Sequence, residues 1–556
     1  MAKDKQAAGP YNIVFILTDQ ERHFRPGELP KGYRLPAHER LAQNGVVFEN
    51  HRINANVCTS SRSVIYTGQH IQHTKMYDNT NFPWMKSMST DIKTLGHMLR
   101  EAGYYTAYKG KWHLTREFES INKLDAPAEM KIFTKEMEAY GFSDYMGIGD
   151  IIAHTQGGYL HDGMIAAAAA NWLRGKASDL AQENKPWFLA VNLVNPHDVM
   201  FYDTDEPGHP MQSKKTLNHV VGDPPHAMYA KQWDFELPVS FSQALDAPGR
   251  PPAHTDYTLT NDALTGPIPV EDTWRWRKRH NFYLNALRDV DRHIMTVLDE
   301  LEDRGLASNT IVILTADHGE MGGAHQMTGK GPSTYREQNN VPLIVSHPAF
   351  AGGKRCKAVT SHLDLAPTLV SMTNASAQKK AEIVGSLPGK DFSAVLAAPE
   401  QAGLDAVRDG QLYCFNMLSA VDGDFLMKAL DLLKEGGPEK FKAAGIRPNL
   451  LKRGGVRGVF DGRYQFTRYY SPKQHNRPTS IEALFELNDV ELYDHQNDPH
   501  ELHNLAMDRV ANAELIMTMN AKLNRLIDEE VGEDVGQMMP GGEDGSWVAT
   551  PAVHDL

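Results

Sequence analysis

Three short, nearly continuous apolar segments stand out along the chain, at residues 11–17, 187–194 and 310–315. Their length and lack of polar interruptions are typical of strands that are buried on both faces of a sheet. Each segment leads into polar residues that could bind a ligand: Asp19 and Gln20, then His197, then Asp317 and His318.

Helical patterns lie between these segments, and the clearest covers residues 283–301, where apolar residues recur every three or four positions. Gly305 follows this pattern and would end the helix. Alternating strands and helices predict an α/β fold with a mostly parallel sheet flanked by helices. In such folds ligands bind beyond the carboxyl ends of the strands, so Asp19, His197 and Asp317 should share one edge.

The length of 556 residues exceeds the roughly 250 to 300 residues at which one hydrophobic core stops growing. We predict a catalytic domain at 10–405, with a Pro-, His- and Asp-rich insertion at 201–273 that shapes the substrate mouth. A smaller α+β subdomain is predicted at 406–531, where alternation around Asp461–Gly462 indicates a hairpin. Residues 532–556 should form an extended tail that lies on the surface or packs on a partner subunit of a homo-oligomer.

Charge, apolar content and cysteine count limit the classes of protein to which this chain can belong. The chain carries 57 Lys+Arg against 70 Asp+Glu, and its net charge of -13 disfavours nonspecific binding to nucleic acid or anionic membranes. It has no apolar run of the roughly 18 residues that a membrane helix needs. The N-terminus lacks the apolar region of a secretory signal, so we expect a cytoplasmic protein. Only three cysteines occur, too few for a disulfide framework.

Asp19, Gln20, Asp317 and His318 offer hard oxygen donors and an imidazole. This set suits a divalent cation such as Ca²⁺, Mn²⁺ or Mg²⁺ better than a soft thiolate site would. The alternative is that the aspartates are ordinary turn residues at strand ends.

Several segments, in this order, resemble the signature blocks of the sulfatase family: 12–20, 58–68, 103–114, 309–320, 330–331 with 341–345, 362–369 and 492–506. The resemblance implies an alkaline-phosphatase-like α/β core and a hydrolase. It also implies that a maturation enzyme oxidises Cys58 to formylglycine, whose hydrated form supplies an oxygen nucleophile. By the same resemblance, one divalent cation, Ca²⁺ in preference to Mn²⁺, is bound by the group made from Cys58 and by four further residues: Asp19, Gln20, Asp317 and His318.

Five further residues match catalytic positions of the family. Arg62, expected in the first turn of the helix after Cys58, would hold the nucleophile. Lys111 and His113 alternate along an extended segment and should face the same way. The resemblance makes Lys111 a contact of nucleophile and substrate, and His113 the base that releases the product. His197 and Lys330 would neutralise or protonate the leaving oxygen.

Asn79 and His325 are expected to contact substrate, although each could equally be a loop residue. Cys356 and Cys414 are expected to be small buried side chains without a chemical role.

Two positions depart from the family pattern. Ser60 stands where the family usually has Pro or Ala, which leaves an unmodified Cys58 thiolate as an alternative metal ligand or nucleophile. Gln20 stands where the family usually has a second Asp. An Asp-Gln pair together with an Asp-His pair resembles the phosphonate monoester hydrolase and related phosphodiesterase branch, as well as some arylsulfatases. The leading hypothesis is hydrolysis of aryl or small alkyl sulfate monoesters. The alternatives are hydrolysis of phosphonate monoesters or phosphodiesters at the same site, and an inactive protein that keeps the fold.

Overall fold

The computed structural model describes residues 10–82, 84–118, 127–147, 156–214, 216 and 220–539. The predictions about a secretory signal at residues 1–9 and about the tail beyond residue 539 lie outside the described residues. No helix in these ranges combines the length and the apolar character needed to cross a membrane.

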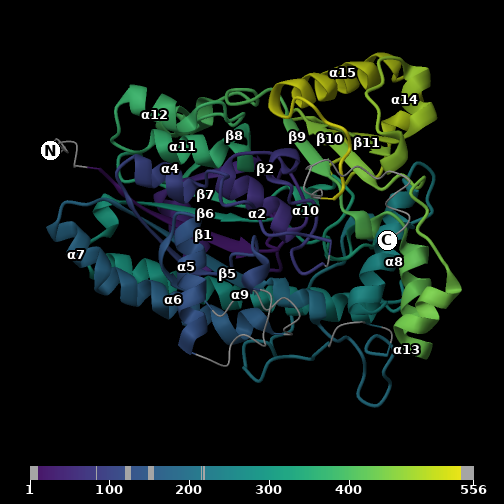
Figure 1. The fold of residues 1–556 in the computed structure, drawn as a ribbon, viewed down its shortest axis with the longest axis horizontal. Helices are drawn as coiled ribbons and strands as arrows, with labels where there is room; N and C mark the ends of the chain where they lie inside the picture. The colour runs from purple at the N-terminus through teal and green to yellow at the C-terminus, as the bar shows by residue number, and fades with distance from the viewer. Residues whose placement is uncertain are drawn as a thin grey trace.

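A central eight-stranded sheet forms the middle layer of the larger part of the molecule (Figure 1). Only β7 runs antiparallel to its neighbours in this sheet, and the other neighbouring pairs are parallel. The three strands predicted from apolar segments lie side by side as β5, β1 and β6. In spatial order, the strands are β4 (Ser143–Met146), β3 (Tyr105–Gly110), β5 (Trp187–Pro196), β1 (Asn12–Asp19), β6 (Thr310–Ala316), β7 (Leu343–Ser346), β2 (Val46–Arg52) and β8 (Lys354–Ser361).

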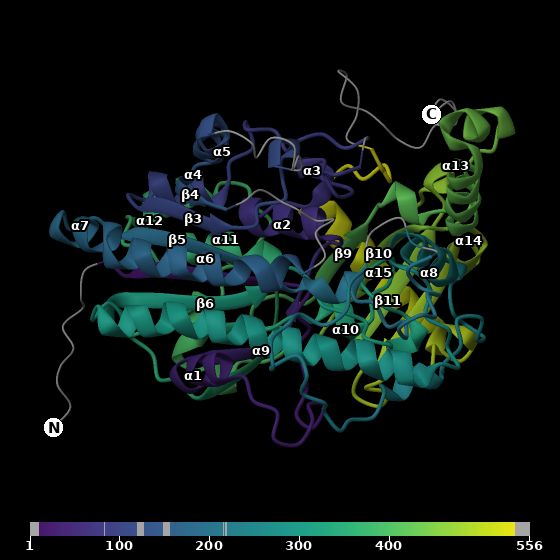
Figure 2. The same ribbon diagram turned by 90° about the horizontal axis from the view of Figure 1, so that it is seen from below.

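Helices cover both faces of this sheet, as the buried strands require (Figures 1 and 2). Ile13, Phe15 and Leu17 of β1 pack into one core cluster, and the alternate residues Val14 and Ile16 pack into another. The first cluster includes residues of α2 (Cys58–Thr67), α4 (Leu95–Glu101), α11 (Leu365–Ser371) and α12 (Ala377–Val384). The second includes residues of α1 (Pro36–Asn44), α6 (Gly157–Arg174), α7 (Lys176–Gln182) and α9 (Thr273–Asp303).

The helix predicted at 283–301 is confirmed as part of α9, which begins ten residues earlier at Thr273. Gly305 lies just beyond its end with φ +68°, a left-handed conformation that glycine adopts without strain. Three further helices in this part are α3 (Ile71–Thr74), α5 (Pro127–Ala139) and α10 (Arg336–Asn339).

The segment 201–273, which we predicted only as an insertion that shapes the substrate mouth, contains the helix α8 (Pro252–Thr265). Pro252 starts the helix, where its missing N–H costs nothing. The inward side carries His254, Asp256 and Asn261 beside small residues. A search for apolar periodicity could not detect such a polar buried face.

A second, four-stranded antiparallel sheet lies to one side of the first (Figure 1), in the order β12 (Asn488–Asp494), β11 (Tyr464–Tyr470), β10 (Gly455–Phe460) and β9 (Gln411–Phe415). The predicted hairpin is confirmed, because β10 and β11 pair on either side of Asp461–Gly462. Three helices accompany this sheet: α13 (Gly423–Ala444), α14 (Ile481–Leu487) and α15 (Ala513–Glu530). The domain boundary near residue 405 stays a prediction, since one hydrophobic cluster contains residues of both α2 and β9.

The first part of the tail packs against this second sheet. Asp534 forms an ion pair with Arg457 of β10. Met538 is buried in a cluster with Val421 and Leu450. The described start of the tail is therefore part of the folded body.

Candidate active site

Four neighbouring parallel strands deliver polar side chains to one edge of the large sheet. Asp19 ends β1, Asp317 follows β6, Lys111 follows β3, and His197 begins the short 3-10 helix after β5. The carboxyl ends of parallel strands meet at the same edge, so residues far apart in sequence become neighbours. The predicted gathering of Asp19, His197 and Asp317 agrees with this arrangement of the strands.

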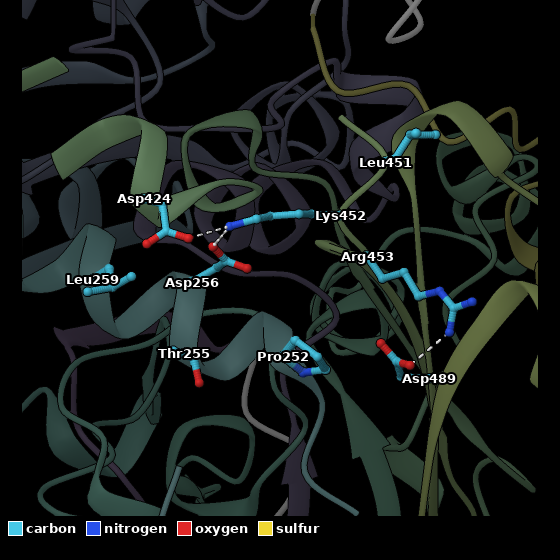
Figure 3. Close-up of a pocket in the computed structure, with 9 residues that line it drawn as sticks. All are labelled: Pro252, Thr255, Asp256, Leu259, Asp424, Leu451, Lys452, Arg453 and Asp489. Carbon is cyan, nitrogen blue, oxygen red and sulfur yellow. Dashed lines mark hydrogen bonds and ion pairs between the residues drawn. The ribbon is translucent and has the colours of Figure 1, made fainter. Parts of the chain in front are cut away.

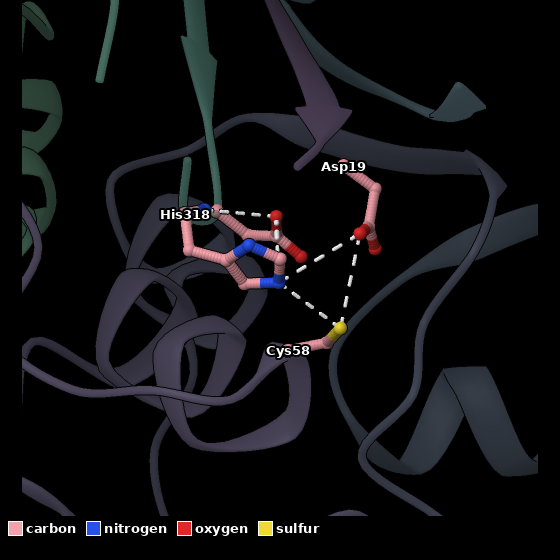
Figure 4. A group of neighbouring side chains, drawn as sticks. Asp19, Cys58 and His318 are labelled. Atoms are coloured by element: carbon pink, nitrogen blue, oxygen red, sulfur yellow. Dashed lines mark hydrogen bonds and ion pairs between the residues drawn. The ribbon is translucent and has the colours of Figure 1, made fainter. Parts of the chain in front are cut away.

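Cys58 faces this edge from the first position of α2, the helix that follows β2. Its Sγ lies 3.1 Å from Nε2 of His318 and 3.7 Å from Oδ1 of Asp19 (Figure 4). With Asp317, these residues each offer a ligand atom within 4.8 Å of the others, and all four are buried. Two carboxylates, an imidazole and a thiol thus form a group that could hold a metal ion.

Arg62 binds both carboxylates of the group. Its guanidinium contacts Asp19 at 3.0 Å and Asp317 at 2.9 Å, while Lys111 Nζ donates to the same Asp19 oxygen at 2.7 Å. Because α2 begins at Cys58 itself, Arg62 is its fifth residue and starts the second helical turn. The expectation of a first-turn position was one residue off, since the first turn contains four residues.

The two carboxyl groups have opposite pKa shifts. Burial would raise the pKa of Asp19, but the charges of Lys111 and Arg62 outweigh it and hold that pKa well below its ordinary value. Burial and the nearby charge of Asp19 raise the pKa of Asp317 to about 7. Two adjacent buried carboxylates disfavour ionising together, and a cation between them would relieve that repulsion.

His318 is arranged as a metal-binding imidazole. Its Nδ1 lies 3.1 Å from the carbonyl oxygen of Gly319, which can only accept a hydrogen bond, so Nδ1 carries the proton. Nε2 is then left with a lone pair directed at Cys58 and Asp19. Burial lowers the pKa of His318 to about 4, which keeps the ring neutral. A backbone acceptor that fixes the tautomer in this way is usual for metal ligands.

Gln20 lies beside the group but has other partners. Its backbone N–H donates to Asp317 at 3.1 Å, while its side-chain oxygen accepts a hydrogen bond from Lys330 Nζ at 2.6 Å. Its amide nitrogen contacts Glu320, which also pairs with Arg279 at 2.6 Å. Gln20 thus joins Lys330 to the strand-end group.

His113 and His197 are both buried at this edge. The hydroxyl of Thr59, the second residue of α2, donates to the backbone oxygen of His113 at 2.8 Å. Burial first, and then the charge of Lys111, lowers the pKa of each imidazole well below its ordinary value. Both rings are therefore neutral near pH 7 and able to accept a proton.

A family model described as Sulfatase matches residues 11–375. The chain belongs to the sulfatase family. It is an enzyme of the class that hydrolyses sulfuric esters, and its fold has the mixed α/β architecture expected from the resemblance.

Known proteins similar to this sulfatase span much of its length. It is 28% identical to the uncharacterized sulfatase YidJ of Escherichia coli (strain K12), covering 69% of this chain and 71% of the relative. It is 24% identical to an endo-4-O-sulfatase of Bacteroides thetaiotaomicron over 94% and 93% of the two chains. A solved phosphonate monoester hydrolase from Silicibacter pomeroyi shares the fold, with a TM-score of 0.64, 19% identity and coverage of 94% and 96%.

The two residues expected to contact substrate occupy different surroundings. Asn79 accepts a hydrogen bond from the backbone N–H of Thr59 at 3.2 Å, so it lies next to the start of α2. His325 stacks on Tyr335 with ring centroids 3.7 Å apart, and its Nδ1 lies 2.6 Å from Gln243. Substrate contact by either residue stays a prediction.

Sequence reasoning assigned no role to two residues that support the site. Asn192 of β5 accepts hydrogen bonds from Arg62 at 3.3 Å and from Tyr66 at 2.8 Å. Glu320 links Gln20 to Arg279. A signal for Asn192 was available, because it is the single polar side chain within the apolar segment 187–194.

A second acidic group and the remaining cysteines of this sulfatase lie in other surroundings. Asp256, Asp422 and Asp424 surround the ammonium of Lys452 at 2.5, 2.8 and 3.0 Å, so a cation already lies among these three carboxylates. Figure 3 shows the contacts of Lys452 with Asp256 and Asp424. All three cysteines are free and buried, which confirms that Cys356 and Cys414 are buried side chains.

Proposed function

We propose that this sulfatase hydrolyses sulfate monoesters of aryl or small alkyl alcohols, using a formylglycine nucleophile made from Cys58 and one divalent cation. The observation that carries the proposal is the position of Cys58, at a helix start and within contact distance of His318 and Asp19. A residue there meets both the metal-binding atoms and the cations that a sulfate group requires.

Asp19, Asp317 and His318 fit a divalent cation. The raised pKa of Asp317 beside Asp19 reflects two carboxylates with too little positive charge between them, and the lone pair of His318 faces the same space. Predominantly oxygen donors support Ca²⁺, with Mn²⁺ as the alternative. Gln20 is the fourth protein ligand in this proposal, although its oxygen accepts a hydrogen bond from Lys330. Such a cation lowers the pKa of a bound oxygen nucleophile and polarises the transferred group.

The remaining site residues take complementary parts. Arg62 and Lys111 place positive charge beside Asp19 and residue 58, where a sulfate oxygen would lie. His113, buried and neutral, accepts the proton that is lost when the product is released. His197 and Lys330 stabilise the leaving oxygen, which gains negative charge as its bond to sulfur breaks.

A peptide mass measurement tests the nucleophile. Trypsin cleaves after Arg52 and Arg62, which isolates residues 53–62 with Cys58 as the sole cysteine. We expect the mass of an aldehyde in place of the CH₂SH group. An unaltered thiol mass would reject formylglycine and leave the Cys58 thiolate as the metal ligand or nucleophile.

Phosphonate monoester or phosphodiester hydrolysis at the same site is the second candidate. Gln20 supports it, because an amide in place of a carboxylate leaves the site more positive, and the structural neighbour named as a phosphonate monoester hydrolase has the same fold. Comparing kcat/KM for matched nitrophenyl sulfate and nitrophenyl phenylphosphonate separates the two. A higher value for the phosphonate by orders of magnitude would overturn the sulfate proposal. Cytoplasmic location, homo-oligomerisation and dependence on a maturation enzyme stay predictions.

A further inference from the structure

A cavity of about 300 Å³ lies next to Lys330 and is formed largely by the insertion at 201–273. Met200 belongs to both places, because it lines the cavity and its Sδ accepts a hydrogen bond from Lys330 Nζ at 2.8 Å. Thr328, two residues before Lys330, lines the cavity as well. The cavity therefore adjoins the position where the proposed leaving oxygen would lie.

Apolar side chains form much of the cavity wall, including Leu245, Ile268, Val270 and Trp276. The indole N–H of Trp276 donates to the backbone oxygen of Pro269 at 3.0 Å and so holds the loop that carries Ile268 in place. The wall is thus built on α8, α9 and a tethered loop, and Met200 supplies one adaptable side chain.

Few charged side chains line the cavity, and Arg279 among them already has a partner of opposite charge. Among the lining residues that the structure describes, Arg279 is the single cation, and it pairs with Glu320 at 2.6 Å. Asp262 adds a negative charge. A substrate with further sulfate groups would lose water without gaining cationic partners in this cavity, at a high cost in free energy.

We propose that this cavity binds the alcohol part of the substrate and selects uncharged, compact hydrophobic alcohols against polyanionic sulfated glycans. This inference rests on the proposed function, since it assumes that ester cleavage occurs beside Lys330. The volume lies at the lower end for small-molecule sites, which suits an aryl or alicyclic group better than an oligosaccharide.

The test compares phenyl sulfate with 2-naphthyl sulfate, whose leaving groups are chemically similar but differ in size. Ile268→Asp and, independently, Val270→Asp place a carboxylate on the wall at partly exposed positions that the fold can accommodate. We expect each variant to lower the naphthyl-to-phenyl ratio of kcat/KM by about tenfold, mainly through a higher KM for the naphthyl ester. Val239→Asp is the matched control, because Val239 belongs to the same insertion, is 55% exposed and lies outside the cavity lining. It should leave the ratio unchanged.

The outcomes separate the two proposals. Hydrolysis of both aryl sulfates with an unchanged ratio in both cavity variants would reject the cavity as the alcohol site, and the proposed function would stand. A higher kcat/KM for a glucosamine with two sulfate groups than for naphthyl sulfate would also overturn the inference. If the aryl sulfates are inert and phenylphosphonate esters are cleaved, the proposed function fails instead. The same ratio, measured with phenyl and naphthyl phenylphosphonates, then decides the role of the cavity.

Discussion

Asp19 and Asp534 are both buried carboxylates that contact an arginine, but they are partnered differently. Asp19, at the edge of the large sheet, is shared between Arg62 and Lys111 and lies beside a second carboxylate. Asp534 meets Arg457 of the small sheet in a bidentate pair, with N···O distances of 2.6 and 2.8 Å. Burial would raise the pKa of Asp534, yet Arg457 holds it well below its ordinary value.

This difference in partners distinguishes a candidate active site from a purely structural ion pair. In the small sheet the guanidinium of Arg457 and the carboxylate of Asp534 match each other in a bidentate pair, so the pair serves to attach the start of the tail. At the edge of the large sheet the carboxylates and cations are shared, and Asp317 keeps a pKa of about 7 because Asp19 is so near. The shared arrangement around Asp19 can therefore bind a further charged group, whereas Arg457 and Asp534 already neutralise each other.

Replacing the nucleophile should have the largest effect. We expect Cys58→Ala to lower kcat for nitrophenyl sulfate by about 10⁴-fold or more, with little change in thermal unfolding. Cys356→Ala is the control, because Cys356 is also buried and free but lies in β8, away from the site. Substantial activity in Cys58→Ala would contradict the assignment of the nucleophile.

Breaking the ion pair between Arg457 and Asp534 should lower the stability of the fold rather than the activity. Arg457→Met leaves Asp534 buried without its cation, so urea denaturation should show a loss of about 3–5 kcal/mol in the free energy of unfolding. The double variant Arg457→Met/Asp534→Leu should recover much of this loss, because no uncompensated charge remains. The kcat of the folded enzyme should not change. A selective loss of activity would show that the two regions are not separate in function.

Removing one cation from the shared group should cost activity. Lys111→Met is expected to lower kcat/KM for sulfate esters by about 10²–10³-fold, as the loss of one charge-stabilising donor typically does. Lys109→Met is the matched control, since Lys109 is also buried and lies two residues earlier, within β3, but donates to the backbone oxygen of Asp144. Equal losses in both variants would point to damage of β3 rather than to a role for Lys111.

The smallest effect should come from Glu491, which accepts hydrogen bonds from Tyr335, Tyr469 and Tyr493. Burial raises its pKa from 4.5 to about 7 despite these bonds. Its contribution to stability is therefore complete below pH 4.5 and is lost as the pH rises through 7. Glu491→Gln should reduce this decline in the free energy of unfolding, by up to about 3 kcal/mol, in urea titrations across that range. An identical pH profile in the variant would rule out Glu491 as its source.

The sequence predicted the structure best where buried apolar strands end in residues that can bind a ligand. Short apolar segments, typical of strands buried on both faces, predicted β1, β5 and β6. Because the carboxyl ends of parallel strands meet at one edge of a sheet, Asp19 and Asp317 were expected to be neighbours, and the structure confirms this. The segments that resemble sulfatase signature blocks predicted Cys58, Arg62 and Lys111 as site residues. The structure shows each of these three residues in contact with Asp19.

Other features depend on contacts that no local pattern encodes. Helix α8 buries polar residues, so its inward face has no apolar period. The link between Gln20 and Glu320 joins positions 300 residues apart, and that between Lys330 and Met200 joins positions 130 apart. His325 belongs to the expected block of sequence, but its stacking on Tyr335 follows from how the loop folds.

The burial of α2 has a consequence for the timing of biosynthesis. Cys58 is 1% exposed and all ten residues of its helix are buried, so an enzyme that modified Cys58 would have to reach it before the chain folds. His318, which closes the site over Cys58, is synthesised 260 residues later, roughly 10 to 50 s at ribosomal speed. If Cys58 is modified as proposed, the yield of active enzyme is set during this interval on the ribosome, by competition between maturation and folding.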